Sequence, residues 1–424
     1  MKESEYTQQK RILIVGAGFA GVALAKKLHR TNYDVVLLDR NNHHTFQPLL
    51  YQVATGGLEA GSIAYPVRRI IRGFKNVRFY MADVHNVNFE SKVLATSVGE
   101  LPYDILVMAN GSTNNFFNFQ PVKDQLLPLK SVADALDIRS YIMQNLEKAI
   151  ATFDSNERSE LLNIAIIGGG PAGLEMAGAL AEMKIHTLPK DFPQIDFNGM
   201  RITLFEAGPK LLGAMSEAAS KHSLKYLEKL GVDVKLGAKV SEYSNHRIVL
   251  EDGATFATDT VIWTAGVKGN ALSGLPKEAI ALGNRVHVDA FNAVIGMQDV
   301  YAIGDVAAMI SDQNPRGHPM LAPVAIQQAK NLARNLVNFQ SSAQFKPYKF
   351  KNKGVMATIG RNKAVVDMPK FRFQGAFAWF VWMFVHIMSL VGFRNRIVTL
   401  IDWMGNYINY DRPLGLIIRP FRKK

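Results

Sequence analysis

Two glycine clusters are the residues whose types and spacing carry the clearest chemistry. The first reads Gly16-Ala17-Gly18-Phe19-Ala20-Gly21 and the second reads Gly168-Gly169-Gly170-Pro171-Ala172-Gly173, each after an apolar run. In such a fingerprint the first glycine makes a tight turn, the second lets the backbone approach a pyrophosphate, and the third lets the helix pack closely on its strand. The helix N-terminus then receives the anion. Two fingerprints in one chain predict two bound dinucleotides, an arrangement that suits hydride transfer between a nicotinamide and a flavin.

A carboxylate follows each fingerprint. Asp39 comes 18 residues after Gly21, close to the spacing expected for an acid on a ribose hydroxyl. Glu206 comes 33 residues after Gly173, because residues 184–200 form a proline-containing insertion that is either a lid, a partner surface or a structural excursion. No Arg lies within four positions of Glu206. Since a carboxylate repels a 2′-phosphate, the second fingerprint is expected to prefer NADH over NADPH.

The elements that must position these residues are two βαβ units. The first is predicted over residues 11–16, 18–30 and 34–39, and the second over 163–168, 171–185 and 201–206. Further strands are predicted over 104–109, 260–264 and 299–305, and a helix over 323–339. The pattern predicts an α/β fold with two Rossmann-like domains of the glutathione-reductase type, the second inserted in the first. The expected domains are 1–128 with 285–345, then 129–284, then a C-terminal region 346–424.

Composition narrows the chemistry. The chain has 424 residues and 48% hydrophobic content, which is enough for two to three globular domains. It has no cysteine, which excludes a disulfide framework, a cysteine-ligated metal site and a redox-active dithiol. Electrons that leave a flavin must then pass directly to an acceptor. No metal cluster or nucleophilic triad is expected, and the polar residues 1–10 match neither a signal peptide nor a transit peptide.

The C-terminal region has a different character. Residues 346–424 hold fifteen Lys and Arg against three Asp, a formal +12 of the total +13. Residues 375–392 are nearly all apolar and would span about 27 Å as a helix, while residues 394–410 have amphipathic periodicity. Basic residues beside apolar helices favour an anionic membrane surface over nucleic acid. We expect a monotopic pair of amphipathic membrane-anchoring helices; a spanning helix and an oligomer interface are the alternatives.

The full length of the chain resembles the type II NADH dehydrogenases, which are non-proton-pumping NADH:quinone oxidoreductases of the two-dinucleotide-binding-domain flavoprotein group. The motifs that carry the resemblance lie at residues 15–21, 46–56, 168–175, 300–305 and 322–328. Phe-Gln-Pro-Leu-Leu-Tyr-Gln-Val-Ala-Thr-Gly at 46–56 and Ala-Pro-Val-Ala-Ile-Gln-Gln at 322–328 are the most specific. The family's last motif commonly begins Ala-Gln, so Pro323 after Ala322 is a departure.

The resemblance implies that the first fingerprint binds FAD. Asp39 would then accept a hydrogen bond from the adenosine ribose, and Asp305 would bond the flavin's ribityl chain, with a helix N-cap as the alternative role of Asp305. The residues expected at FAD are Gly16, Ala17, Gly18, Phe19, Ala20, Gly21, Asp39, Arg40, Val84, Gly111, Asp305 and Ala325.

The resemblance likewise implies an NADH site and a quinone site. The residues expected at NADH are Gly168, Gly170, Gly173, Glu175, Glu206 and Gly266, and those expected at the quinone are Pro48, Ala322, Gln327 and Gln328. Glu175 and Gln327 are the expected catalytic residues. Glu175 would position the nicotinamide and affect proton movement, or simply compensate the helix dipole. Gln327 and Gln328 would donate to a quinone carbonyl, or face solvent.

The expected activity follows from this resemblance. NADH would reduce FAD by hydride transfer, and the reduced flavin would then reduce a membrane quinone. The resemblance implies peripheral attachment to the cytoplasmic face of a bacterial inner membrane, a homodimer and no nucleic-acid partner. The alternatives are a sulfide:quinone oxidoreductase, whose chemistry needs cysteines, a soluble ferredoxin-type reductase, and a membrane-associated flavin sensor without turnover.

Overall fold

The chain divides into two compact units. The computed structural model describes residues 9–340, 344–409, 416, 417, 420 and 421. Unit 1 contains residues 1–44, 65–113 and 267–351, and unit 2 contains residues 45–64, 114–266 and 352–424. Unit 1 is discontinuous along the chain, and its bounds differ from the expected 1–128 with 285–345. Residues 352–424 belong to the same compact unit as the second fingerprint, whereas the sequence suggested a separate third region.

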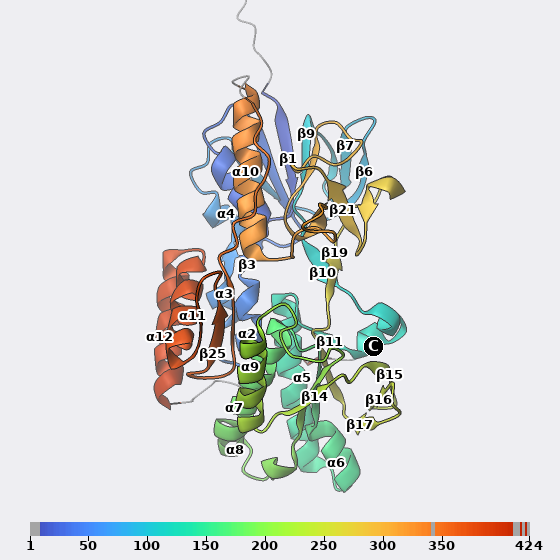
Figure 1. Ribbon diagram of the computed structural model, residues 1–424, viewed down its shortest axis with the longest axis vertical. Helices are drawn as coiled ribbons and strands as arrows, with labels where there is room; N and C mark the ends of the chain where they lie inside the picture. Colours follow the sequence, from blue (N-terminus) through green and yellow to red (C-terminus); the bar gives the residue numbers. More distant parts are fainter. Residues whose placement is uncertain (1–8, 341–343, 410–415, 418–419, 422–424) are drawn as a thin grey trace, which may run out of the picture. The chain divides into compact units, whose positions relative to one another are not determined.

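Unit 1 is built on a five-stranded parallel sheet in the order β22-β9-β1-β2-β5. Its strands are β1 Arg11–Val15, β2 Asp34–Asp39, β5 Val77–Met81, β9 Ile105–Met108 and β22 Val300–Ala302. Because both faces of a parallel sheet are covered, its inner strands are mostly apolar; all four residues of β9 are buried. Helices α1 (Phe19–Leu28) and α10 (Ala322–Gln340) pack against each other beside this sheet (Figure 1). Helix α10 starts one residue before the predicted helix 323–339, so Pro323 is its second residue.

Smaller elements complete unit 1. Three antiparallel strands form one sheet, β6 Val84–Asn88, β7 Val93–Thr96 and β8 Gly99–Pro102. A second small sheet contains β20 Ile280–Ala281, β21 Arg285–Val288 and β23 Ala307–Met309. The remaining short elements are α4 Val67–Ile70, η4 Lys277–Ala279 and η5 Gly304–Val306. Four short strands lie where the chain leaves or re-enters unit 1: β3 His43–Thr45, β4 Ala64–Pro66, β10 Ser112–Asn114 and β19 Val267–Gly269.

Unit 2 repeats the same design. Its parallel sheet has the order β11-β18-β12-β13-β14. The strands are β11 Leu127–Pro128, β12 Ile164–Ile167, β13 Ile202–Glu206, β14 Asp233–Leu236 and β18 Thr260–Trp263. The helices around it are α5 Val132–Ala151, α6 Ser155–Leu162, α7 Pro171–His186 and α9 Glu217–Lys229. In both units the fingerprint strand is the central strand, which confirms the predicted pair of Rossmann-like folds.

The insertion 184–200 folds back on unit 2. It contains α8 (Leu188–Asp191) and the short helix η3 (Phe197–Gly199). Leu188 and Phe192 are buried, and Lys184 Nζ donates to the carbonyl of Met200 at 2.7 Å. These contacts fix the insertion on its own unit, and its role stays a prediction. A small antiparallel sheet of this unit is formed by β15 Val240–Ser244, β16 Arg247–Leu250 and β17 Thr255–Ala257. The short helix η2, Phe117–Gln125, also belongs to this unit.

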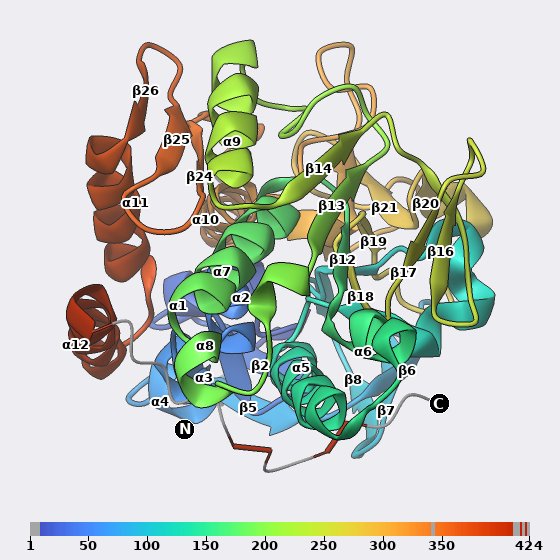
Figure 2. The ribbon, with the colours of Figure 1, turned by 90° about the horizontal axis from the view of Figure 1, so that it is seen from below.

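The C-terminal segment forms a sheet with two helices. Its antiparallel strands are β24 Val355–Thr358, β25 Ala364–Asp367 and β26 Arg372–Gly375. Helix α11 (Ala376–Ser389) packs on this sheet, and α12 (Phe393–Asn409) packs on α11 and α3 (Figure 2). The remaining elements here are η1 Gln47–Leu49, α2 Leu50–Ala54 and α3 Ala60–Ile63.

Helix α11 is shorter than the apolar run that contains it. The helix has 14 residues, or about 21 Å at 1.5 Å per residue, against about 30 Å for a bilayer core. The chain turns at Leu390, whose carbonyl accepts a hydrogen bond from Arg396 Nε at 3.0 Å. Among the described residues, no helix has the length and apolar content needed to cross a membrane.

Candidate functional site

The first fingerprint has the geometry of a phosphate cradle. Gly16 adopts φ +107°, and a Cβ there would lie 2.4 Å from the carbonyl oxygen of Ala109. A Cβ on Gly21 would lie 1.8 Å from the carbonyl oxygen of Gly16. Gly18 is the N-cap of α1 and has nothing within 4 Å of a Cβ. Two glycines are therefore required by the protein's own packing, while the third leaves an open space at a helix N-terminus.

The second fingerprint repeats this geometry. Gly168 has φ +111° and would place a Cβ 2.8 Å from Ala265 Cα, while a Cβ on Gly173 would lie 1.9 Å from the Gly168 carbonyl oxygen. Gly170, the N-cap of α7, again has open space. Thr264 also holds this turn, because its Oγ1 donates to the carbonyls of Ile167 at 2.8 Å and Gly168 at 3.1 Å. Thr264 was not among the site residues expected from the sequence, although Gly266, two residues later, was.

The two carboxylates have matching hydrogen bonds. Asp39 Oδ2 accepts from the backbone N–H of Ala17 at 2.7 Å, and Glu206 Oε2 accepts from that of Gly169 at 2.6 Å. The second oxygen of each accepts from the N–H two residues onward, Asn41 at 2.8 Å and Gly208 at 2.6 Å. Each acid is thus fixed at the end of its strand, beside its own fingerprint.

Lys210, the basic residue nearest to Glu206 on its C-terminal side, is already engaged. Its Nζ forms an ion pair with Glu217 Oε1 at 2.6 Å and donates to the carbonyl of Met215 at 3.4 Å. The Glu206 carboxylate is therefore fixed in place, and the nearby Lys210 is paired with Glu217 instead. This is the arrangement expected for an unphosphorylated ribose.

Asp305 lies in a tight turn that collects several residues expected at FAD. Gly304 adopts φ +77°, and a Cβ there would lie 3.3 Å from the Cβ atoms of both Ala20 and Ala325. Ser112 Oγ donates to Asp305 Oδ2 at 2.6 Å. The structure thus brings the fingerprint helix, the Gly-Asp turn and α10 together within unit 1, as predicted.

Gln328 supports this turn from behind. Its side chain is fully buried, and its Oε1 accepts from the N–H of Gly304 at 2.7 Å. Its Nε2 has no hydrogen-bond partner among the described residues. A quinone contact was expected here, but a side chain with no exposed surface cannot make one, so we assign Gln328 to the Gly-Asp turn.

Arg285 is a residue that sequence reasoning missed. It is only 6% exposed, and its guanidinium donates to the carbonyls of Asp305 at 3.0 Å, Arg316 at 3.0 Å and His318 at 2.9 Å, as well as to that of Ala307. These bonds connect the Gly-Asp turn to the loop before α10. Its neighbours in the sequence give no signal of this role, because the carbonyls come from another part of the chain.

Gln327 contacts the end of unit 1. Its amide Nε2 donates to the carbonyl of Lys351 at 3.0 Å, and its Oε1 accepts from the N–H of Lys351 at 2.9 Å. Ala322 is the first residue of the same helix. Pro48 lies in η1 of unit 2, half-buried. The expected quinone residues are therefore divided between the two units, and the role of Gln327 stays a prediction.

Glu175 is buried on α7, where β24 and α11 cover it. Its Oε1 accepts from the N–H of Thr358 at 3.4 Å, and the side chain is 7% exposed. Burial raises the pKa of this carboxyl to about 8, and the Thr358 N–H and the Trp382 indole lower it by less. The carboxyl therefore holds its proton at neutral pH. Thr358 and Trp382 come from the C-terminal segment and were missed.

The remaining expected residues lie at the edges of the two cradles. Arg40 is exposed and 3.6 Å from Asp83, Val84 begins β6, and Gly111 adopts φ +69° after β9. Gly266 has φ +141°, and its carbonyl accepts from the N–H of Asn115 at 3.1 Å. The buried His44 also contacts the first cradle, because its Nδ1 bonds the Ala17 carbonyl at 2.9 Å. This contact is structural.

Comparisons with known proteins agree with this geometry. Residues 10–329 match the family model described as pyridine nucleotide-disulphide oxidoreductase, and residues 352–409 match the NDH2 C-terminal domain. The type II NADH:quinone oxidoreductase Ndh of Mycobacterium tuberculosis is 33% identical over 420 residues, covering 96% of this chain and 89% of the relative.

This chain belongs to the type II NADH:quinone oxidoreductases. The solved structure of NDH2 from Plasmodium falciparum with NADH has a TM-score of 0.89 at 22% identity, covering 96% of this chain and 100% of that one. The sulfide:quinone oxidoreductase of Aquifex aeolicus has a TM-score of 0.73 at 17% identity, covering 94% of each chain. Both likenesses show the two-dinucleotide-domain fold.

Family membership confirms the predicted enzyme class. The chain is an oxidoreductase that uses FAD and NADH and reduces a quinone. The matched family is named for disulphide chemistry, yet this chain contains no cysteine. Its reaction therefore involves no protein dithiol.

Proposed function

We propose that the cradle of unit 1 holds FAD and that of unit 2 holds NADH. The observation that supports this most strongly is the matched pair of fingerprints, each with an open N-cap glycine and a fixed carboxylate. The Gly-Asp turn, with Ser112 and Arg285 behind it, is found in unit 1 only among the described residues. An aspartate held there can accept from a ribityl hydroxyl, so unit 1 takes the flavin.

The residues around each site orient and neutralise the bound groups. When bound, FAD accepts a hydride from NADH and passes two electrons to the quinone. The N-termini of α1 and α7 offer backbone N–H groups to the two pyrophosphates. Asp39 and Glu206, each beside its own cradle, accept hydrogen bonds from ribose hydroxyls.

Glu175 is the residue we propose for proton handling. Reduction of a quinone to a quinol by NADH consumes one proton beyond the transferred hydride. Glu175 is a protonated, buried carboxyl at neutral pH, held by the Thr358 N–H. Since a general acid works best when its pKa lies near the working pH, this carboxyl is suited to hold and release that proton.

The two cofactor sites can be tested separately. The Asp39→Ala variant should be purified with less FAD, because an acceptor beside the first cradle is lost. The Glu206→Gln variant should keep its FAD but lose at least tenfold in kcat/KM for NADH relative to NADPH, which corresponds to about 1.4 kcal/mol. Flavin absorbance and steady-state oxidation of both nucleotides measure these effects. Loss of FAD from Glu206→Gln, or equal use of NADH and NADPH by the unmodified enzyme, would contradict the assignment.

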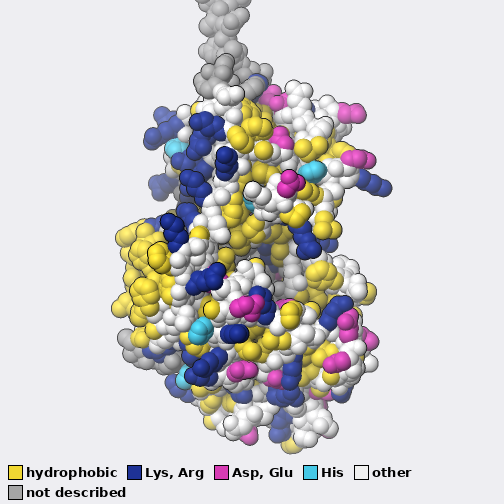
Figure 3. Space-filling view, in the orientation of Figure 1, with side chains coloured by type: hydrophobic (Ala, Val, Ile, Leu, Met, Phe, Trp, Pro, Cys, Tyr) yellow, Lys and Arg dark blue, Asp and Glu magenta, His cyan; other side chains and the backbone are white. Residues whose placement is uncertain are grey.

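We further propose that α11 and α12 attach the enzyme to a membrane. Both helices expose apolar side chains along one stripe, Phe377 69%, Phe380 55%, Phe384 66% and Met388 52% on α11, and Phe393 76%, Ile397 41%, Ile401 61% and Met404 57% on α12. Figure 3 shows this apolar surface over the two helices. Exposed apolar surface of this kind marks an interaction site. Lys370, Arg372 and Arg394 are exposed beside it and suit anionic lipid.

The stripe can be removed without removing the helix. Trp382 is 1% exposed on the inner face of α11, so deleting the helix would open the core. Replacing Phe377, Phe380 and Phe384 by Gln changes exposed positions only. This variant should float with anionic liposomes to a smaller extent than the unmodified enzyme, but it should still oxidise NADH with a water-soluble quinone. Flotation equal to that of the unmodified enzyme would contradict the membrane proposal.

The same two helices are also the basis for a proposed location of the enzyme in the cell. We propose a peripheral enzyme on the cytoplasmic face of a bacterial inner membrane, which takes its quinone from the lipid phase. The basic residues from Arg412 to Lys424, counted in the sequence as part of this surface, lie outside the described residues. The homodimer stays a prediction, which light scattering of the purified enzyme checks.

A further inference from the structure

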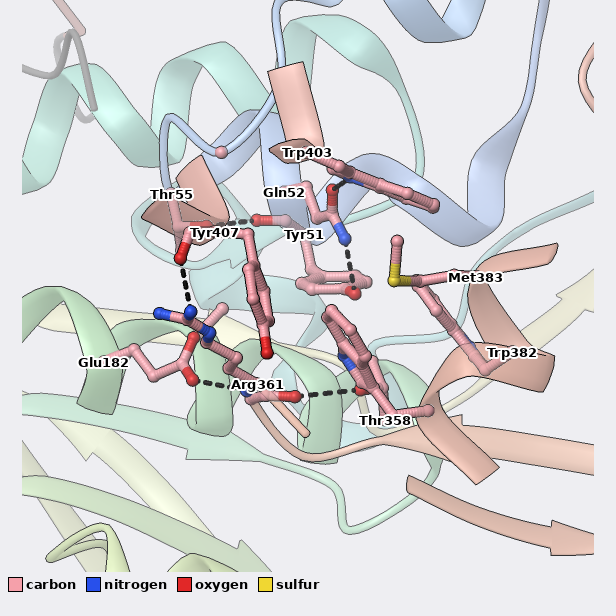
Figure 4. A pocket seen from close by; sticks show the side chains of 14 residues that line it. Tyr51, Gln52, Thr55, Glu182, Thr358, Arg361, Trp382, Met383, Trp403 and Tyr407 are labelled. Atoms are coloured by element: carbon pink, nitrogen blue, oxygen red, sulfur yellow. Dashed lines mark hydrogen bonds between the residues drawn. The ribbon is translucent and has the colours of Figure 1, made fainter. Parts of the chain in front are cut away.

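Phe117 is an aromatic residue of unit 2 that none of the sites described above uses. Many rings of this unit pack against one another, as in the aromatic pocket of Figure 4, where Trp382 and Trp403 lie 5.6 Å apart between ring centroids. Phe117 is 58% exposed, and among the described residues its ring packs on no other aromatic ring. A single exposed ring needs no explanation by itself, so its backbone and its neighbours decide what it can do.

The backbone of Phe117 is held in an unusual conformation. Its φ is +44°, in the left-handed region that a bulky residue adopts only at a cost in free energy. The Phe117 N–H donates to Asn115 Oδ1 at 3.1 Å, and the Asn115 N–H donates to the carbonyl of Gly266 at 3.1 Å. The Asn115 carbonyl in turn accepts from Trp263 Nε1 at 2.9 Å. Hydrogen bonds to the end of β18 therefore hold this turn in place.

The phenylalanines on either side of Phe117 pack into the unit. The rings of Phe116 and Phe119 lie 5.9 Å and 5.0 Å from the Trp263 ring between centroids. Phe119 is buried and belongs to the hydrophobic core of unit 2, and Phe116 packs against that core. Core packing thus accounts for these two rings, whereas it does not account for the exposed ring of Phe117.

The Phe117 ring contacts the proposed NADH site at Gly266. A Cβ on Gly266 would lie 3.2 Å from Phe117 Cζ and 3.4 Å from Cε2, so the edge of the ring occupies the place of the missing side chain. The preceding residue, Ala265, packs against the fingerprint, since a Cβ on Gly168 would lie 2.8 Å from Ala265 Cα. The exposed ring therefore lies one residue away from the contact that shapes the second cradle.

The strand order of unit 2 indicates which half of NADH meets Gly266. Glu206 ends β13, the fingerprint follows β12, and Gly266 comes three residues after β18, which pairs with β12 on the side opposite to β13. A dinucleotide lies across the carboxyl ends of such strands. With its adenosine ribose at Glu206 and its pyrophosphate at the fingerprint, NADH would extend its other half toward β18. That half carries the nicotinamide.

We propose that the Phe117 ring packs against the nicotinamide half of NADH beside Gly266 and fixes its orientation. The inference rests on the proposed NADH site of unit 2 and adds a contact residue outside both the fingerprint and its carboxylate. An aromatic face or edge suits a planar nicotinamide ring, which it meets without a hydrogen bond. A backbone conformation that costs free energy is typical of residues held in place for binding. Phe117 orients the nucleotide and takes no part in bond making or breaking.

Nucleotides that contain only part of NADH test this contact in the FAD-loaded enzyme. Reduced nicotinamide mononucleotide has the nicotinamide half alone, and ADP-ribose lacks the nicotinamide ring. In the Phe117→Ala variant, kcat/KM for NADH and for reduced nicotinamide mononucleotide should each fall by about tenfold, because both lose the ring contact. The inhibition constant of ADP-ribose against NADH should change by less than about twofold. Steady-state oxidation with a water-soluble quinone measures all three values.

Three further variants separate the ring from the backbone. Phe117→Tyr keeps a flat ring and should retain most of the kcat/KM for NADH. Phe117→Gly removes the ring but suits φ +44°, and it should lose as much as Phe117→Ala does. Phe153→Ala is the matched control, because it removes a 98% exposed ring between α5 and α6 of the same unit and should behave as the unmodified enzyme does. Flavin content and thermal unfolding show whether each variant is folded.

An unchanged kcat/KM for NADH in Phe117→Ala would overturn the proposal. It would also be overturned if ADP-ribose were weakened as much as NADH, because the ring would then support the cradle as a whole. Normal activity of Phe117→Gly beside a defective Phe117→Ala would assign the effect to the backbone and overturn it as well. Glu206→Gln tests the NADH site itself, since it should weaken ADP-ribose and NADH together. Failure of the ring contact is therefore distinguishable from failure of the proposed function.

Discussion

At the scale of single residues, the two units place the same chemical types at the same structural positions. Asp39 and Glu206 each end the second strand of a βαβ unit, and each accepts from the N–H of the second fingerprint residue. The units differ in what is added. Unit 1 adds the Gly-Asp turn held by Arg285, and unit 2 adds the buried Glu175 covered by the C-terminal segment. In the function proposed above, these additions distinguish the flavin site from the nicotinamide site.

The buried Glu175 predicts a pH dependence of stability. Its pKa is about 8 in the fold against 4.5 as the reference value, so the unfolded chain releases the proton first as the pH rises. The native state then loses stability between these two values, relative to a variant that cannot titrate. At pH 5 the Glu175→Gln variant should unfold at a temperature similar to that of the unmodified enzyme. At pH 8 it should unfold at a higher temperature, because its free energy of unfolding should exceed that of the unmodified enzyme by about 2–4 kcal/mol.

Thermal unfolding of both FAD-loaded proteins from pH 5 to pH 9 measures this difference. The Glu182→Gln variant, on the same helix, is the matched control for loss of an acid. A Glu175→Gln difference that does not change with pH would show that the carboxyl titrates normally. Anaerobic flavin bleaching by NADH, followed over the same pH range, tests its proposed role in the reaction.

At the scale of elements, the strand-to-helix turn is the working part of each unit. The first and third glycines are required by contacts inside the protein, while the second stands free at the helix N-cap. Helix α11 also has two distinct faces. Its inner residues Ala378 and Trp382 are buried, while Phe377 and Phe380 are exposed. One element thus covers Glu175 and presents apolar surface outward.

The glycine contacts predict opposite results for two substitutions. Gly21→Ala would place a Cβ 1.8 Å from the Gly16 carbonyl oxygen, so the turn must distort, and we expect little folded protein. Gly18→Ala has open space and should fold, but its methyl group would point into the cradle and lower FAD affinity at least tenfold. Circular dichroism and flavin titration of the apoprotein distinguish these results. A Gly18→Ala variant with normal FAD affinity would show that the cradle does not approach the pyrophosphate.

At the scale of the whole molecule, the charge and the apolar surface of the C-terminal region act on the same proposed partner. The region from residue 346 carries a formal +12 of the chain's +13. Its helices α11 and α12 expose two apolar stripes. Attraction to anionic lipid and burial of apolar side chains are both expected to contribute, but only the first is screened by salt.

Salt should therefore release the enzyme from membranes only in part. In 1 M NaCl, where screening acts over about 3 Å, a substantial fraction should stay bound to anionic liposomes. The variant with Gln at positions 377, 380 and 384 should be released completely under the same conditions. Sedimentation of liposomes at increasing salt measures both proteins. Complete release of the unmodified enzyme would mean that charge alone holds it on the membrane.

The sequence by itself determined the two Rossmann-like folds and the cradles, because each fingerprint works through contiguous residues. The turn, the N-cap and the carboxylate at the end of the next strand all follow from local spacing. The strand β2, Asp34–Asp39, matches its predicted bounds for the same reason. The family also followed from motifs that lie within short stretches, at 46–56 and 322–328.

Only the tertiary structure decided which distant groups meet. Glu175 and Thr358 are 183 residues apart, Ser112 and Asp305 are 193 apart, and Arg285 bonds carbonyls up to 33 residues away. Gln328, expected at the quinone, is fully buried behind Gly304. Local patterns specify turns and faces of helices, but the burial of a carboxyl or the closing of an aromatic pocket depends on which segments pack together.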